Sequence, residues 1–177
     1  MTTQTAVLGG GCFWCTEAVF QEIKGVTSAV PGYAAGKTAE PSYQQVSMGT
    51  TGHAEVVKVE FDPAVVSYKQ LLQVFFATHD PTTRDRQGND IGSQYRSIVL
   101  YASDEQKKVA EETMAELNKE YFGGKIVTEV QPLGDFYEAE EYHHDYFKKN
   151  PQAGYCQVII SPKVAKLRKQ FAPLLAK

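Results

Sequence analysis

The segment Ala54-Glu55-Val56-Val57-Lys58-Val59-Glu60-Phe61 alternates between apolar and charged side chains over most of its length, and Asp62-Pro63 ends it. A strand places successive side chains on opposite faces. Val57, Val59 and Phe61 therefore share one face, and Lys58 and Glu60 share the other. One apolar and one polar face are typical of a sheet that helices cover on one side only. We expect a two-layer α/β sandwich of the α+β class rather than a doubly wound sheet.

Periodicity and turn residues predict further elements on both sides of this strand. We expect strands at residues 5–8, 26–30, 94–101 and 125–130, and helices at residues 12–23, 43–46, 67–78, 103–121, 138–149 and 163–175. The sequence contains no internal repeat and no low-complexity linker. We therefore expect a single domain over residues 1–177.

Composition narrows the class of protein. The 177 residues are 42% hydrophobic and 22% charged, with a net charge of −3, which is typical of a globular protein and lacks the basic balance of a nucleic-acid binder. No apolar run reaches the ~20 residues that span a bilayer, and residues 1–5 lack the basic and apolar parts of a secretory signal. We expect a cytoplasmic protein with no nucleic-acid or membrane partner.

The three cysteines, Cys12, Cys15 and Cys156, are too few for a disulfide scaffold. The segment Gly-Gly-Gly-Cys-Phe-Trp-Cys at residues 9–15 follows a predicted strand and opens a predicted helix, which places Cys12 at the helix N-terminus. Free N–H groups and the helix dipole favour a thiolate there. We expect the pKa of Cys12 to lie below the ~8.5 of a free thiol. The alternative is a small buried side chain beneath a tight turn.

Other interpretations of this segment remain open. Cys12 and Cys15 have the C-x-x-C spacing of thioredoxin-like dithiol oxidoreductases, although Cys15 shares a helical stripe with Val19 and Ile23, which favours a core position. A glycine-rich turn before a helix also binds anions. The Lys and Ser/Thr of a P-loop are missing, however, and the dinucleotide-binding glycine pattern does not match.

A zinc site is a weaker interpretation. Zinc takes about four ligands, and here only Cys156 with His143 or His144 could complete a set begun by the C-x-x-C pair. Adjacent histidines face different sides of a helix, which is poor geometry for one metal. We predict no metal site and expect the two histidines on the surface.

Glu55 is the next candidate for chemistry. Alternation places it on the same face as Val57 and Val59, and carboxylates are rarely buried without a role. Burial raises the pKa of a carboxyl group and can keep it protonated as a general acid. The alternative is that Glu55, near the start of the strand, reaches water. Phe13 and Trp14, beside Cys12, could line an apolar pocket for a small substrate group or simply belong to the core.

Four further residues are candidates from their local setting. Tyr43 and Tyr95 lie beside predicted loops, where a hydroxyl group can point into a cleft. Asp90 lies in a loop whose simplest interpretation is a solvated turn. Cys156 follows a polar segment with Pro and Gly. A mobile cysteine near a reactive one can act as its resolving partner, because a sulfenic acid condenses with a nearby thiol.

Six segments resemble, in the same order, motifs of the peptide methionine sulfoxide reductase A family. They are residues 11–14 (GCFW), 52–55 (GHAE), 87–90 (QGND), 94–97 (QYRS), 139–143 (AEEYH) and 154–156 (GYC). The resemblance covers nearly the whole chain. It implies a single catalytic domain, a two-layer sandwich with a ferredoxin-like core and a coil-rich C-terminal part.

The resemblance also implies a role for each candidate residue. Cys12 matches the catalytic nucleophile, Glu55 matches the acid that protonates the sulfoxide oxygen, and Cys156 matches the resolving cysteine. Tyr43 and Tyr95 match hydroxyl donors to the sulfoxide oxygen, and Asp90 matches a polar residue of the same site. Phe13 and Trp14 match the pocket for the methyl group.

The implied reaction is reduction of the S epimer of methionine sulfoxide, free or in oxidised proteins, as a repair after oxidation. Attack by Cys12 leaves a sulfenic acid, Cys156 converts it to a disulfide, and thioredoxin resets the pair. No cofactor is implied. The chain departs from the family in two ways: Cys15 stands where many members have Gly, and the further C-terminal cysteine of some members is missing. Whether Cys15 takes part in recycling stays open.

Overall fold

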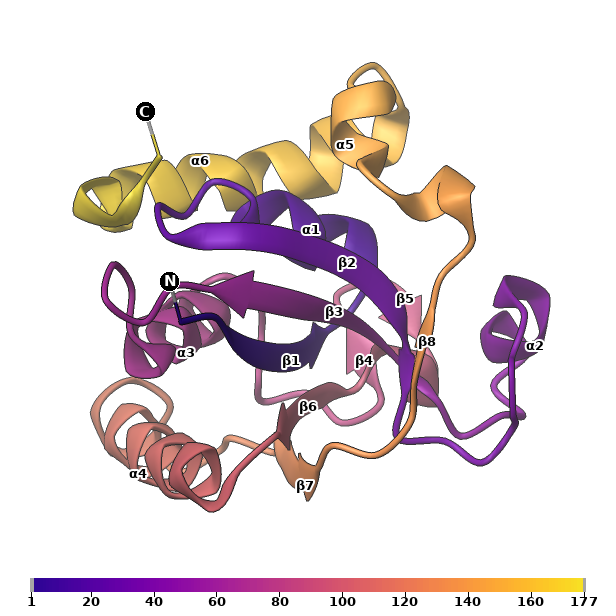
Figure 1. The fold of residues 1–177 in the computed structure, drawn as a ribbon. Helices are drawn as coiled ribbons and strands as arrows, with labels where there is room; N and C mark the ends of the chain where they lie inside the picture. Colours follow the sequence, from indigo (N-terminus) through magenta and orange to yellow (C-terminus); the bar gives the residue numbers. More distant parts are fainter. Residues whose placement is uncertain (1, 177) are drawn as a thin grey trace.

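The computed structural model describes residues 2–176, and a six-stranded sheet forms its centre (Figure 1). In sheet order the strands are β7 (Glu129–Pro132), β6 (Ser97–Tyr101), β1 (Gln4–Gly10), β3 (Ala54–Phe61), β2 (Val26–Ala34) and β8 (Phe136–Glu138). Neighbouring strands are antiparallel except β6 and β7, which are parallel. The alternating segment at residues 54–61 is β3, with the predicted bounds, and it lies inside the sheet between β1 and β2.

Helices and short turns connect these strands. The longer helices are α1 (Phe13–Phe20), α3 (Tyr68–Ala77), α4 (Asp104–Tyr121) and α6 (Ser161–Gln170). Shorter elements are α2 (Tyr43–Ser47), α5 (Tyr146–Lys149), the hairpin of β4 (Arg86–Gln87) and β5 (Asp90–Ile91), the 3-10 turns η1 (Ser93–Tyr95), η2 (Glu141–His143) and η4 (Ala172–Leu174), and the π-helical turn η3 (Cys156–Ile160). Within residues 2–176, no helix combines the length and the hydropathy that crossing a membrane requires.

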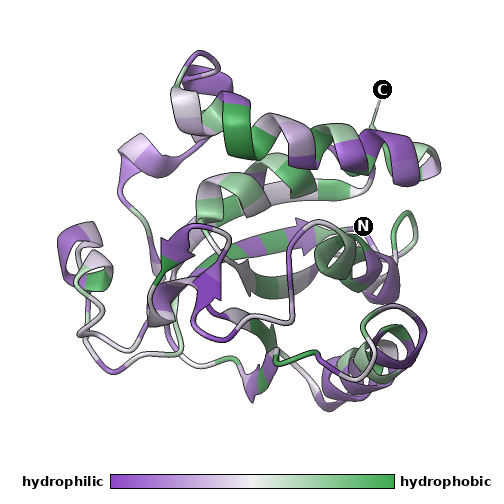
Figure 2. Cartoon of the chain, turned by 180° about the vertical axis from the view of Figure 1, so that it is seen from behind, coloured by the Kyte–Doolittle hydropathy of each residue, from purple (hydrophilic) through white to green (hydrophobic). Residues whose placement is uncertain are grey.

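The helices form a layer on one face of the sheet. Helices α1, α3 and α4 lie against this face, and α6 covers the outer side of α1 (Figures 1 and 2). The connection β1-α1-β2-β3-α3-β6, with the sheet order β6-β1-β3-β2, is that of the split βαβ or ferredoxin-like motif. The predicted two-layer sandwich with a ferredoxin-like core is confirmed.

The two faces of β3 differ as its alternation predicts. Val57, Val59 and Phe61 are buried in the main core beneath the helices, whereas Lys58 and Glu60 on the opposite face are partly exposed. Near the start of β3, however, the opposite face is also shielded from water. There Val56 belongs to a second apolar cluster, onto which Phe136 of the C-terminal part packs. The sheet is therefore covered by helices on one face and in part by the C-terminal chain on the other.

Strand β2 is longer than predicted. The sequence suggests that Pro31-Gly32 ends a strand at residue 30, but β2 continues to Ala34. The two backbone polar groups of a strand residue point to the same side. The Pro31 carbonyl accepts from Ala139 N–H on the side of the edge strand β8, so the missing N–H of Pro31 removes no bond to β3. Gly32 is also required, because the Phe136 ring occupies the place of a side chain there.

The helix predicted at residues 138–149 is wrong. This stretch contains the end of β8, the turn η2 and the four-residue α5. Asp145 lies between η2 and α5 with a φ of 54°, in the left-handed region that interrupts a right-handed helix. The stretch therefore forms separate short elements and not one helix.

Several other predicted elements have different bounds. The helix predicted at 12–23 ends at Phe20, and the strand predicted at 94–101 starts only at Ser97, after η1. The strand predicted at 125–130 forms at Glu129–Pro132. The terminal helix predicted at 163–175 is α6, which begins at Ser161 and ends at Gln170, and the 3-10 turn η4 follows it. The hairpin β4–β5 lies where only a polar loop was expected.

Candidate active site

Cys12 lies between the end of β1 and the first turn of α1. Gly11 has a φ of 100°, which side chains other than glycine rarely adopt, and the Gln87 side chain fills the space that a Cβ at Gly11 would need. The chain therefore turns sharply at Gly11 and leaves Cys12 as the residue before Phe13, the first residue of the helix. The predicted position at the helix N-terminus is confirmed, and the Cys12 side chain is 9% exposed.

Glu55 approaches the same helix end from β3. It is 1% exposed, and its Oε1 accepts a hydrogen bond of 3.1 Å from Phe13 N–H. Burial raises the pKa of Glu55 to about 8; the Phe13 bond lowers it, and the negative charge of Asp90 raises it further. Glu55 lies on the core face, as the alternation of β3 predicts, and it does not reach water. At neutral pH the carboxyl group is mostly protonated, as proton donation requires.

The two cysteines of α1 have opposite pKa shifts. Burial, the hydrogen bond to Cys15 and the negative charge of Glu55 raise the pKa of Cys12 well above its usual value. The pKa of Cys15 is lowered to about 7, because the neighbouring Cys12 thiol and the positive charge of Lys163 stabilise its thiolate. The predicted lowering for Cys12 is therefore wrong. A bond to Trp14 N–H at the helix start does favour the Cys12 thiolate, but burial outweighs it.

All three cysteines meet in one apolar cluster. Cys12, Cys15 and Cys156 are buried free thiols that pack together with side chains of α1 and α6. Cys156 opens η3 and is 0% exposed, although its sequence setting is polar. The fold thus brings the distant Cys156 to the same place as the C-x-x-C pair. Among residues 2–176, no three His, Cys, Asp or Glu side chains are grouped so that they could hold a metal ion.

Tyr43 and Tyr95 lie near Glu55 and Cys12. Burial raises the pKa of both phenols, and the negative charges of Glu55 and Cys12 raise it further. Glu140 holds Tyr43 in place, since its Oε2 accepts from Tyr43 N–H at 2.9 Å. Tyr43 on α2 and Tyr95 on η1 are thus far apart in sequence, yet both lie close enough to Glu55 and Cys12 for these charges to affect their pKa values.

Asp90 is not a solvated turn residue. Its Oδ2 accepts a hydrogen bond of 2.7 Å from the Tyr155 hydroxyl, whose oxygen also lies 3.7 Å from Cys15 Sγ. Tyr155 immediately precedes Cys156, so this contact links the β4–β5 hairpin to the segment that carries the third cysteine. Sequence reasoning did not single out Tyr155, although it stands in the GYC motif.

Phe13 and Trp14 form an aromatic wall with residues from the C-terminal part. The Trp14 ring stacks on Tyr146 at a centroid distance of 3.7 Å, with 5° between the ring planes. Trp14 Nε1 donates to His143 Nδ1 at 3.0 Å, and the His143 ring lies 4.9 Å from that of Phe13. The expected surface position of His143 is wrong, because this side chain is 0% exposed. The AEEYH motif, which includes His143, is the signal that could have identified it.

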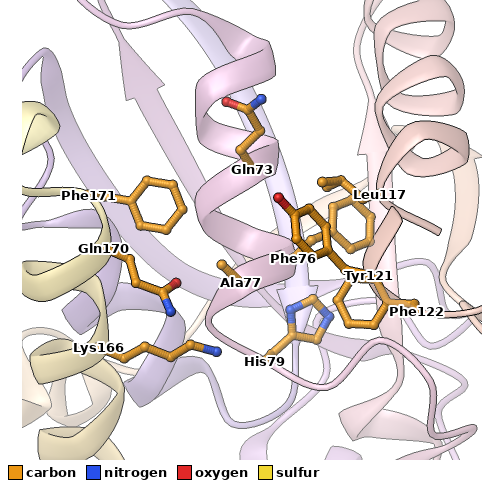
Figure 3. Close-up of a pocket in the computed structure, with 10 residues that line it drawn as sticks. All are labelled: Gln73, Phe76, Ala77, His79, Leu117, Tyr121, Phe122, Lys166, Gln170 and Phe171. Carbon is orange, nitrogen blue, oxygen red and sulfur yellow. The ribbon is translucent and has the colours of Figure 1, made fainter. Parts of the chain in front are cut away.

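A cavity of about 620 Å³ opens elsewhere, between α3, α4 and α6 (Figure 3). Its lining includes His79, Lys166 and Phe171, but neither Cys12 nor Glu55. Cavity size therefore does not identify the site; the converging thiols, carboxyl and hydroxyl groups do.

Comparison with known proteins agrees with this geometry. The family model "Peptide methionine sulfoxide reductase" matches residues 4–174. A peptide methionine sulfoxide reductase MsrA of Halobacterium salinarum is 58% identical over 172 residues, which cover 97% of each chain.

Two solved structures of one yeast protein are also similar. Mxr1 of Saccharomyces cerevisiae in its reduced form aligns with a TM-score of 0.81 and 37% identity over 87% of this chain and 89% of that one. Mxr1 in complex with Trx2 aligns with a TM-score of 0.58 and 28% identity over 81% and 84%. The resemblance seen in the six motifs is confirmed. The chain belongs to the peptide methionine sulfoxide reductase family and is an oxidoreductase that reduces methionine sulfoxide.

Proposed function

We propose that this protein reduces the S epimer of methionine sulfoxide, free or in oxidised proteins, with Cys12 as nucleophile and Glu55 as general acid. The hydrogen bond from Phe13 N–H to Glu55 Oε1 carries this proposal. It fixes a buried carboxyl group, with a pKa of about 8, at the helix end where Cys12 lies. A proton donor and a thiol are thereby available to one substrate.

The chemistry needs both groups. A sulfoxide sulfur is electrophilic, but its oxygen leaves only when protonated. Cys12 attacks the sulfur as thiolate while Glu55 gives its proton to the oxygen. The protonated oxygen then passes to Cys12 Sγ as the S–O bond and the new bond between the two sulfurs break, so methionine departs with its sulfur reduced and Cys12 keeps the oxygen as a sulfenic acid.

The neighbouring residues orient the substrate. The Tyr43 and Tyr95 hydroxyl groups donate hydrogen bonds to the sulfoxide oxygen, and Asp90 adds a polar group to the same site. Phe13 and Trp14 hold the methyl group in the aromatic wall. Support for these roles comes from the partial burial of both tyrosines, from the effect of the Glu55 charge on their pKa values and from the packing of Trp14 on Tyr146.

Recycling uses the third cysteine. The Cys156 thiol attacks the Cys12 sulfenic acid, water leaves, and a Cys12–Cys156 disulfide forms. Thioredoxin then reduces this disulfide by exchange. The shared apolar cluster of the cysteines and the existence of a yeast Mxr1–Trx2 complex support this order. Cys15 is a second candidate for the resolving thiol, because it lies three residues from Cys12 and in the same apolar cluster.

We also propose that residues 1–177 act as one catalytic domain in the cytoplasm, without a bound cofactor. The reaction as written needs only side chains of the chain itself and an external dithiol. Neither a nucleic acid nor a membrane enters it.

Single-turnover chemistry tests the proposal. Fully reduced protein is incubated with each epimer of methionine sulfoxide in the absence of reductant, and the methionine formed is counted. We expect about one equivalent from the S epimer, none from the R epimer, and none from either with Cys12→Ser. Methionine formation by Cys12→Ser at the wild-type rate would refute the scheme, and Cys156→Ser serves as the matched control that keeps the first step.

A further inference from the structure

Glu17 is a buried carboxylate that the proposed reaction does not use. It lies on α1, one turn after Trp14, and is 1% exposed because α6 and the C-terminal part cover this helix. Its Oε2 accepts a hydrogen bond of 3.0 Å from Asp145 N–H. The carboxylate therefore holds the backbone where α5 begins.

The turn that Glu17 holds has an unusual conformation. Asp145 has a φ of 54°, which few residues other than glycine adopt without support from their surroundings. Gln21, one helical turn beyond Glu17, donates from Nε2 to Asp145 Oδ1 at 2.6 Å. Residues of α1 and its C-cap thus hydrogen-bond both the backbone and the side chain of Asp145.

The residues on either side of this turn contact the only tryptophan of the chain. Tyr146, directly after Asp145, stacks on the face of the Trp14 ring. His143, two residues before Asp145, accepts from the edge of that ring through Nδ1. The orientation of Trp14 therefore depends on the position of the turn.

We propose that Glu17 is a positioning residue of the substrate pocket: by holding the turn at Asp145, it places Tyr146 and His143 against Trp14 and so shapes the wall that receives the methyl group. This inference rests on the proposed role of Trp14. Burial raises the pKa of Glu17 to about 7, so the group is largely ionised, and a full-strength acceptor, at pH 8.

Two readouts at pH 8 test the proposal. Trp14 is the sole indole fluorophore, so its emission and its quenching by acrylamide report on this wall alone. We expect Glu17→Ala to increase quenching and to raise KM for methionine sulfoxide about tenfold, a change of the size that lost hydrogen bonds produce. The single-turnover rate at saturating sulfoxide should stay within about threefold of wild type. Glu17→Gln, which keeps one acceptor oxygen, should show quenching and a KM between those of the wild type and Glu17→Ala.

Gln21→Ala is the graded comparison, because it removes only the side-chain contact to Asp145 and should change quenching and KM in the same direction as Glu17→Ala but by less, with KM raised about twofold. Tyr146→Leu should reproduce the effects of Glu17→Ala, and the double variant should show no further loss, since both act through one contact. Should Glu17→Ala fail to fold, as far-ultraviolet circular dichroism would reveal, Glu17→Gln takes its place in this cycle.

Three outcomes would overturn the inference: unchanged quenching and KM in Glu17→Ala, a lower single-turnover rate with unchanged KM, or additive effects in the double variant. The fluorescence readout needs no turnover. A wild-type protein that failed to reduce the sulfoxide would refute the proposed function while the contact between Glu17 and the Trp14 wall could still be measured.

Discussion

Glu55 is the residue on which the acid chemistry depends. Its pKa of about 8 means that the proton is present at neutral pH and is lost as pH rises through 8. We expect the single-turnover rate to fall above pH 8 for this reason. Glu55→Gln, which donates a hydrogen bond but no proton, should slow the chemical step ~10²–10⁴-fold with little change in KM, and Glu55→Ala should be slower still. Rapid-quench methionine release at saturating sulfoxide measures both. Wild-type rates in the two variants would make Glu55 a bystander.

The same group affects stability with a definite sign. An acid whose folded pKa is raised destabilises the fold as pH rises from its unfolded value of ~4.3 to about 8. For a side chain as buried as Glu55 this amounts to about 3–5 kcal/mol. Chemical denaturation should find that this loss, spread over pH 4.5 to 8, is absent in Glu55→Gln. An identical pH dependence in the variant would show that Glu55 is ionised at neutral pH.

The pKa shifts of Cys12 and Cys15 predict which of the two sulfurs is ionised in the reduced protein without substrate. Cys15, with a pKa of about 7, should supply the first thiolate seen at 240 nm in a pH titration of the reduced protein. Cys15→Ser should remove this step, whereas Cys156→Ser should keep it. A step near pH 7 that survives in Cys15→Ser would assign the thiolate to Cys12 and restore the helix-terminus argument.

At the scale of elements, the turn between β1 and α1 is set by one glycine. Gly11→Ala places a Cβ at a φ of 100° and against the Gln87 side chain, so we expect a loss of about 2–4 kcal/mol in the free energy of unfolding. Gly134→Ala is the control, because no atom lies within 4 Å of a Cβ at Gly134 and its φ is not in the strained region. Equal stability of the two variants, measured by urea denaturation, would contradict this account of the turn.

The turn η3 makes a second prediction at this scale. Cys156→Ser should still reduce one equivalent of sulfoxide, but turnover with thioredoxin should fall at least tenfold and sulfenic acid should accumulate on Cys12. Cys15→Ser should recycle nearly as the wild type does. Mass spectrometry of dimedone-treated protein identifies the sulfenic acid. The reverse pattern, in which Cys15→Ser stalls and Cys156→Ser recycles, would assign the working disulfide to Cys12 and Cys15.

Elements were predictable where the cause of their conformation is local. The alternation of β3 and the glycine turn before Cys12 both depend on neighbouring residues, and both are found as predicted. Strand β2 continues through Pro31 because the missing N–H of this residue faces the edge strand β8 and not β3. Strand β8 lies more than a hundred residues later in the chain. The helix expected at 138–149 fails because α1 holds Asp145 in a left-handed turn. Neither cause is visible within a window of one element.

At the scale of the whole molecule, the same distinction applies to the site. Cys12, Glu55 and the aromatic pair could be found from sequence, since helix ends and strand faces are local properties. The raised pKa of Cys12 and the burial of His143 could not be predicted from sequence, because the C-terminal part packs across α1 and shields both side chains from water. The local setting and the family resemblance suggested Cys156 as the resolving cysteine, and the fold places it in the thiol cluster.

The complete burial of Cys156 has a consequence for life under oxidative stress. Oxidised glutathione and other small disulfides cannot reach a sulfur with no exposed surface, so the resting enzyme does not form mixed adducts at this position. The packing around η3 thus protects the thiol that we propose as the resolving cysteine from oxidation by small reagents.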